Sequence, residues 1–258
     1  MTLAPLDWLA LGFQAACFYV VPATAAVVLV RRLHVRWRTL GLGALTWLSA
    51  LPFLIGVPLV SVALLAGDDR QRAGLVWGVA LSLTAAVAEE TSRYLWYRRA
   101  QLPDRRAAIV AGLGHGATEA FVLGLQFVVA QLVLVLAHPE LLPPEAQDPH
   151  VVATWAWIGG ASRLLFVAGH VGLTLLVWRA VRDRRPGGWL AAIGLHAALD
   201  LAAFVLPALV PHTEWAVYAL AVPLAGWATA SVASELRAAY TSAARPADTS
   251  SAGVTEAG

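Results

Sequence analysis

Charged and titratable side chains recur inside the most apolar parts of this sequence. They lie in the segments EETSR, HGATE, RLLFVAGH and HAALD, and they are Glu89, Glu90, Arg93, His115, Glu119, Arg163, His170, His196 and Asp200. Such groups are rare and costly in hydrocarbon, and they usually serve a function there. Imidazole nitrogens are good ligands for zinc, and a neighbouring carboxylate can act as a base or as a further ligand. We therefore expect an active site or an ion site inside a membrane.

The composition requires a membrane-embedded chain to hold these residues. Of the 258 residues, 59% are hydrophobic and 13% are charged, whereas a soluble domain carries about 25% charged residues. Apolar runs of about 20 residues can cross a bilayer as helices. We predict an all-α bundle of about seven transmembrane helices, at residues 6–30, 39–66, 73–97, 107–137, 151–179, 188–210 and 213–235.

Basic residues alternate between the predicted loops. Clusters of arginine occur at 31–38, 98–106 and 179–185, whereas the intervening loop HPELLPPEAQDPH carries acids and no basic Lys or Arg. By the positive-inside rule the arginine-rich loops are cytoplasmic. We expect the N-terminus outside and the C-terminus in the cytoplasm of a multi-pass cell-membrane protein. The net charge of +2 reflects this topology and gives no reason to expect a nucleic-acid partner.

The polar residues share a depth and share helix faces. Glu89, His115, His170 and His196 each lie about 12–14 Å from the cytoplasmic end of their predicted helix, at 1.5 Å per residue. His115 and Glu119 are four residues apart, as are His196 and Asp200, so each pair shares a face. These faces must turn inward, because lipid cannot satisfy them. We predict His115, His170 and His196 as metal ligands.

Small residues and charges constrain how this site is built. A ridge of small residues, Gly112, Gly116, Ala120 and Gly124, permits close helix approach along the fourth span. Arg163 lies deep in its span, so we expect it to form an ion pair with Glu119 or Asp200 and to orient the site.

Two points about charge stay open at this stage. Arg93 is near a helix end and could equally extend to the interface. The four carboxylates of the site exceed its two arginines by two charges, which a divalent cation or two protons would neutralise.

Cys17 is the one cysteine, so neither a disulfide nor a cysteine-based metal site is expected.

The order of motifs resembles that of a known superfamily. EExxR at Glu89 to Arg93, FxxxH at Phe166 to His170, and HxxxD at His196 to Asp200 resemble the motifs of the CAAX-protease and bacteriocin-processing superfamily of intramembrane proteases. The segment GHGATE and the chain length are similar to its YhfC-type intramembrane metalloprotease branch. The commoner first motif of the superfamily is EExxxR, so Arg93 departs from it by one position.

This resemblance implies hydrolysis of a peptide bond within the bilayer. The paired glutamates, Glu89 and Glu90, would activate water as catalytic residues together with Arg93. His170 and His196 would bind a metal or stabilise the oxyanion, and Asp200 would orient His196. His115 and Glu119 match the additional motif of the branch, His115 as a ligand and Glu119 as a residue that holds a ligand in place. The expected cofactor is zinc or another divalent metal, and the expected substrate is a membrane protein or a membrane-bound peptide in the lipid bilayer.

Two other functions use the same residues. A proton- or metal-coupled transporter would employ inward Glu, Asp and His as a relay or a transient cation site, although no internal repeat typical of transporters is visible. A non-catalytic membrane scaffold is the other alternative. We expect one integral membrane bundle at 1–236, followed at 237–258 by a tail rich in Ala, Ser, Thr, Pro and Gly that cannot bury a core.

Overall fold

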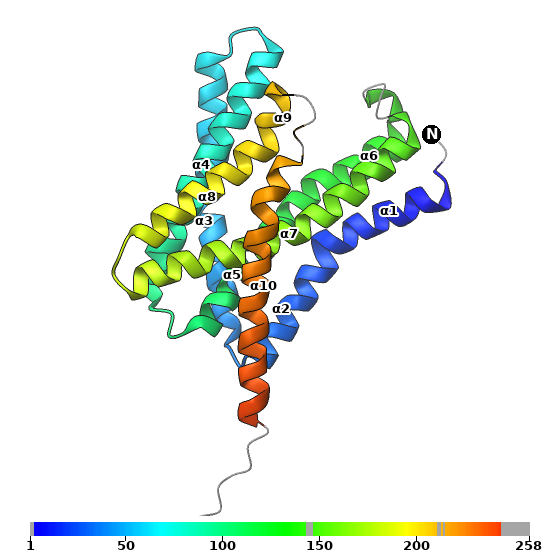
Figure 1. Cartoon of the computed structure of the whole chain (residues 1–258). Helices are drawn as coiled ribbons and strands as arrows, with labels where there is room; N and C mark the ends of the chain where they lie inside the picture. The colour runs from blue at the N-terminus through cyan, green and yellow to red at the C-terminus, as the bar shows by residue number, and fades with distance from the viewer. Residues whose placement is uncertain (1–2, 143–146, 211–212, 214, 244–258) are drawn as a thin grey trace, which may run out of the picture.

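The computed structural model describes residues 3–142, 147–210, 213 and 215–243. Within these residues the secondary structure is entirely helical, as Figure 1 shows. Seven helical segments are long and apolar enough to cross a membrane, which confirms the predicted class. They are Pro5–Arg32, Trp37–Leu65 (α3), Arg70–Ala100 (α4), Arg105–Gly124 (α5), Pro149–Arg182 (α7), Gly187–Phe204 (α8) and Ala216–Thr241, the last within α10 at Ala216–Ala243.

Two spans contain a local widening that hydropathy does not reveal. The first is built from α1 at Pro5–Ala15, a π-helical turn at Ala16–Val20 and α2 at Val21–Arg32. The run predicted at 107–137 is α5, a π-helical turn at Leu125–Val129 and α6 at Ala130–Ala137. A π turn inserts one residue without exposing the backbone, so an apolar run passes through it unbroken.

The remaining boundaries differ by a few residues. The predicted span 188–210 comprises α8 and the short α9 at Leu206–Leu209, and a short 3₁₀ turn follows α6 at Pro139–Leu141. Helix α10 continues to Ala243, so the predicted tail begins inside a helix. Residues 244–258 of that tail lie outside the described residues. The division into a bundle and a tail therefore stays a prediction.

Aspartates begin three of the helices that carry the site. Asp69 accepts hydrogen bonds from the backbone of Gln71 and Arg72 at the start of α4. Asp104 caps α5 at 2.8 Å from the backbone nitrogen of Ala107, and Asp148 caps α7 through His150. Such caps satisfy backbone donors that the first turn leaves free. They fix where each helix starts, and therefore the depth of its polar residues.

Helix α5 lies at the centre of the bundle, between α3 and α7. Of its most apolar stretch 67% is buried, against 17% for α3, so α5 faces protein whereas α3 faces largely outward. The predicted ridge of small residues explains the close packing on one side. A Cβ at Gly112 would lie 2.9 Å from the Cα of Val171, and one at Gly116 would lie 3.2 Å from the Cβ of His170. These glycines bring α7 against α5.

Helix α3 approaches α5 even more closely on another side. A Cβ at Gly43 would lie 1.8 Å from the carbonyl oxygen of Ala111, and one at Gly114 would lie 2.1 Å from that of Leu40. Backbone meets backbone at both points, so no flexible side chain can move aside. The contact at Gly43 could not be predicted from the sequence, because one glycine in an apolar run does not indicate which helix it packs against.

Gly43→Ala is therefore expected to destabilise the bundle, because α3 must move away from α5. Overpacking costs about 1–3 kcal/mol, and a contact between two backbones should lie at the upper end. Thermal unfolding in mild detergent measures the change. Gly41→Ala is the matched control, because a Cβ at Gly41 meets no atom within 4 Å. Equal midpoints for the two variants would contradict this close approach.

Candidate functional site

The EETSR segment places two glutamates and an arginine on one inward face of α4. Glu89 is 3% exposed, and Glu90 and Arg93 are 0% exposed. The guanidinium of Arg93 forms an ion pair with Glu90, and its Nη2 lies 3.7 Å from Oε2 of Glu89. Arg93 therefore turns into the bundle, which decides the point that the sequence left open. A buried guanidinium needs such partners, because an unpaired charge in this environment is costly.

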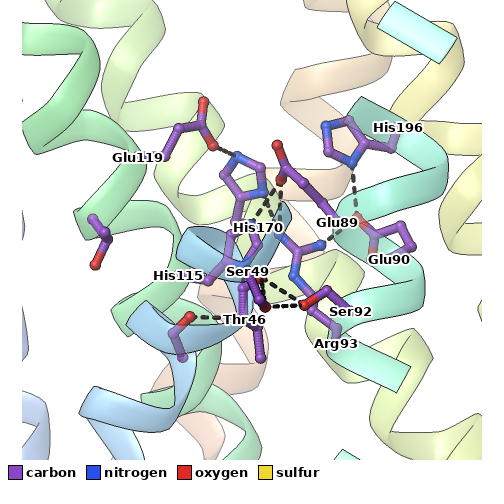
Figure 2. A network of polar contacts seen from close by, with 12 residues as sticks. Thr46, Ser49, Glu89, Glu90, Ser92, Arg93, His115, Glu119, His170 and His196 are labelled. Atoms are coloured by element: carbon purple, nitrogen blue, oxygen red, sulfur yellow. Dashed lines mark hydrogen bonds and ion pairs between the residues drawn. The ribbon is translucent and has the colours of Figure 1, made fainter. Parts of the chain in front are cut away.

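His115 faces Glu89 from α5. Its Nε2 lies 2.8 Å from Oε2 of Glu89, and its Nδ1 lies 2.8 Å from Oγ1 of Thr46 on α3. Both neighbours are buried, and His115 itself is 0% exposed. Figure 2 shows these side chains converging with those of α4 on one interior region.

Glu119 lies on α5 one turn beyond His115, and there it contacts His170 of α7. Oε1 of Glu119 lies 2.9 Å from Nη1 of Arg163, and its Oε2 is in contact with Nε2 of His170. The predicted ion pair of Arg163 with Glu119 or Asp200 is thus confirmed, with Glu119 as the partner. Arg163 also stacks against the rings of Phe18 and Phe166, so its charged group is held between an acid and two aromatic faces.

Arg93 also contacts His170, and this contact determines where the imidazole carries its hydrogen. Nη2 of Arg93 donates to Nδ1 of His170 at 2.7 Å, because a guanidinium can only donate. A neutral His170 then carries its hydrogen on Nε2, the atom that faces Glu119. In this arrangement His170 is a hydrogen-bond donor toward the interior of the site.

His196 joins the site through the second glutamate of α4. Its Nδ1 lies 2.8 Å from Oε1 of Glu90, and its Nε2 lies 3.6 Å from Oδ2 of Asp200 on the next turn of α8. The rings of His115, His170 and His196 follow one another, with centroids 5.1 Å and 5.5 Å apart. The three imidazoles are therefore neighbours, and their common depth below the cytoplasmic face stays a prediction.

The structure brings all the predicted polar residues into one connected set of contacts. The order is Asp200, His196, Glu90, Arg93, His170, Glu119 and Arg163, with Glu89 and His115 joined through Arg93. Five helices contribute if Thr46 of α3 is included. Thr46 was missed by the sequence analysis, because threonine is an ordinary residue in an apolar helix and bonds to its own backbone there.

Four of these residues have the spacing that a metal ion needs. One ligand atom from each of Glu89, His115, Glu119 and His170 lies within 4.8 Å of the others. Ligand bonds of 2.0–2.1 Å place neighbouring ligand atoms of a tetrahedral ion about 3.3 Å apart, so the group has a suitable size. Oε2 of Glu119 faces the group and contacts only Nε2 of His170 among the described ion pairs. Two imidazoles and two carboxylates are a donor set that suits zinc and other divalent ions.

His196 lies outside this group of four, because its Nδ1 is directed to Glu90. The predicted ligand set of His115, His170 and His196 therefore stays a prediction, with Glu89 and Glu119 as alternative ligands that the geometry supplies. Arg93 pairs most closely with Glu90 and Arg163 with Glu119, so the two carboxylates in excess of arginine are Glu89, within the group, and Asp200, beside His196.

Comparisons with known proteins match most of this chain. The family model described as YhfC intramembrane metalloprotease matches residues 17–221. An uncharacterized membrane protein YhfC of Bacillus subtilis (strain 168) is 27% identical over 213 residues, which cover 75% of this chain and 82% of the relative. No solved structure matches the chain. The matched region contains every residue of the contact network, and the chain belongs to the YhfC intramembrane metalloprotease family.

Proposed function

We propose that this protein is an intramembrane endopeptidase that hydrolyses a peptide bond with the help of a divalent metal. The observation that carries the proposal is the buried group of Glu89, His115, Glu119 and His170, whose ligand atoms lie within 4.8 Å of one another. An ion bound there would polarise a carbonyl and generate a nucleophilic water at neutral pH. Membership of the YhfC family supports the same reaction class.

His115 and Glu119 are the residues we propose first as holders of the ion. They are four residues apart on α5 and therefore share one helix face, and that face is turned to α4 and α7. His170 lies opposite on α7. It can serve as a further ligand only if its Nε2 gives up the hydrogen that the Arg93 contact places there. Otherwise it donates a hydrogen bond to the oxygen that becomes negative during attack.

Glu89 is the proposed general base. Its Oε2 lies beside His115, so it can accept a proton from a water at the group of four. Glu90, by contrast, is occupied by Arg93 and by His196. Those two contacts hold Glu90 away from the reaction, and they position His196 near it. This division supports Glu89 over Glu90 as the base, a choice that the sequence left open.

The substrate proposed for this site is a membrane protein or a membrane-bound peptide. The site is enclosed by helices whose outer faces are apolar, including exposed Phe53, Leu59 and Leu83, so a substrate would enter from the bilayer.

We also propose the cell membrane as the location, with the N-terminus outside. A reporter fused after Arg185 should then report the cytoplasm, and one inserted at 143–149 the exterior. The opposite result would place the site nearer the outer face.

Metal analysis of the purified protein tests the proposed function. We expect one bound divalent ion per chain in mild detergent, lost in His115→Ala and Glu119→Gln. Retention of the ion in His196→Ala would favour the group of four as ligands, and its loss there would favour the three histidines. Loss in His170→Ala would mark His170 as a ligand, whereas an ion retained together with lost activity would mark it as a donor. His34→Ala, in a loop far along the sequence from all four residues, is the control. A wild-type protein free of metal that still cleaves substrate would contradict the metal-dependent reaction.

A further inference from the structure

Thr46 of α3 touches the site through a hydroxyl with two close neighbours. Its Oγ1 lies 2.6 Å from the carbonyl oxygen of Gly43 and 2.8 Å from Nδ1 of His115. Thr46 is 0% exposed, as is His115. Neither the motifs of the sequence nor the group of four ligand atoms includes this residue.

A count of hydrogens determines the direction of both bonds. The hydroxyl has one hydrogen, and the carbonyl of Gly43 can only accept. Without a hydrogen between them, two oxygens 2.6 Å apart would repel each other, so the hydroxyl of Thr46 donates to Gly43. Its oxygen then accepts from Nδ1 of His115. A neutral His115 consequently carries its hydrogen on Nδ1 and has a free lone pair on Nε2.

That free lone pair is directed into the group of four. Nε2 of His115 lies 2.8 Å from Oε2 of Glu89, on the side of the ring away from Thr46, so in the metal-free protein the hydrogen of this contact belongs to the Glu89 carboxyl, and a bound ion would take its place. The opposite holds for His170, where the donor Arg93 places the hydrogen on Nε2. The two imidazoles therefore carry their hydrogens on different nitrogens. His115 presents a lone pair that can bind a metal, and His170 presents an N–H that can donate a hydrogen bond.

Further contacts hold Thr46 rigidly in place. Oγ of Ser92 on α4 donates to the carbonyl of Thr46 at 2.7 Å, and Ser92 lies 2.6 Å from Oγ of Ser49. Nε1 of Trp96 donates to Ser49 at 3.1 Å. Figure 2 shows Thr46, Ser49 and Ser92 near one another, next to His115. With the backbone contact at Gly43, this seam fixes the turn of α3 that carries Thr46 against α4 and α5.

We propose that Thr46 is a positioning residue that sets the Nδ1–H tautomer of His115 and thereby directs Nε2 toward the metal. The tautomer follows from the contacts of the metal-free protein, whereas the effect on the metal rests on the proposed function. Hydrogen-bond partners of ligating histidines fix the tautomer and orientation of the ring, and their loss typically weakens metal binding about 10–100-fold.

The first measurement is the tautomer itself. In ¹⁵N-histidine-labelled, metal-free protein, the resonances of His115 are identified by their loss in His115→Gln. We expect couplings typical of a hydrogen on Nδ1, and a change toward Nε2–H or a mixture in Thr46→Val. Thr46→Ser keeps the hydroxyl and should retain the wild-type pattern. An Nε2–H tautomer in the wild type would overturn the proposal.

The second measurement is affinity for Zn²⁺ by competition with a chelator. Thr46→Val should bind about 10–100-fold more weakly than wild type, and Thr46→Ser within a few-fold of it. Thr118→Val is the matched control and should bind as wild type does, because among the described residues the hydroxyl of Thr118 bonds only to the carbonyl of Gly114, one helical turn back. Equal affinity in Thr46→Val and wild type would overturn the role of Thr46.

The two measurements separate this inference from the proposed function. If wild-type protein binds no Zn²⁺, the metal-dependent function is wrong, and the role of Thr46 in presenting a ligand is wrong with it. The tautomer of His115 still shows in that case whether Thr46 and His115 are hydrogen-bonded. If wild type binds Zn²⁺ and Thr46→Val shows an unchanged tautomer, the function stands and the inference is wrong.

Discussion

Glu89→Gln should abolish proteolysis of a membrane substrate while the protein stays folded. Glutamine has the shape of glutamate, but it cannot accept the proton of the attacking water. A general base typically contributes about 10²–10⁴-fold to rate, so the loss should be far outside the error of an assay. The carboxylate concerned is the one beside His115 in the group of four.

The assay uses a labelled single-span substrate in proteoliposomes, with metal content measured on the same preparation. We expect Glu89→Gln to retain its ion, because His115 and Glu119 remain. Glu140→Gln controls for the substitution itself, because Glu140 is exposed and lies near His138 in the loop after α6. If Glu89→Gln and Glu90→Gln both cleave at near wild-type rate, the hydrolase is excluded, and transport of protons or divalent cations becomes the function to test.

The sequence predicts the bundle and the membership of the site for clear physical reasons. Length and apolarity alone define a transmembrane helix, and titratable groups in such a helix must face inward. Spacing along α5 therefore sufficed to place His115 and Glu119 on one face. The same argument required an acidic partner for Arg163, and Glu119 is that partner.

The partners within the site could not be predicted in the same way. Glu89 and Glu90 are adjacent, and a rotation of about 100° per residue sends them to different neighbours. Which one meets His115 depends on how α4 is rotated in the bundle, and no pattern in the chain fixes that rotation. The contact of Thr46 with His115 could not be predicted for a related reason, because it depends on the close approach of α3 to α5 at Gly43. The π-helical turns also leave no signal in hydropathy.

Glu90→Gln should destabilise the folded bundle strongly, in contrast to Glu89→Gln. Glu90 and Arg93 are both 0% exposed and form an ion pair, and Glu90 also accepts from His196. Removing one member of a buried ion pair leaves the other charge uncompensated, which typically costs about 3–5 kcal/mol. Arg93→Met should cost a similar amount, because it leaves Glu90 without its cation.

The double variant Glu90→Gln with Arg93→Met distinguishes this pairing from a general loss of packing. Removal of both charges leaves no buried ion unpaired, so the double variant should be more stable than either single variant, as a double-mutant cycle measures. Thermal unfolding in detergent provides the values. Asp183→Asn is the control, because Asp183 forms an exposed ion pair with Arg182, and exposed pairs contribute little to stability. Activity should not return in the double variant, since Arg93 also donates to His170. If the losses of the two single variants simply add, Glu90 and Arg93 are not coupled, and Glu90 would be free to act as the base in place of Glu89.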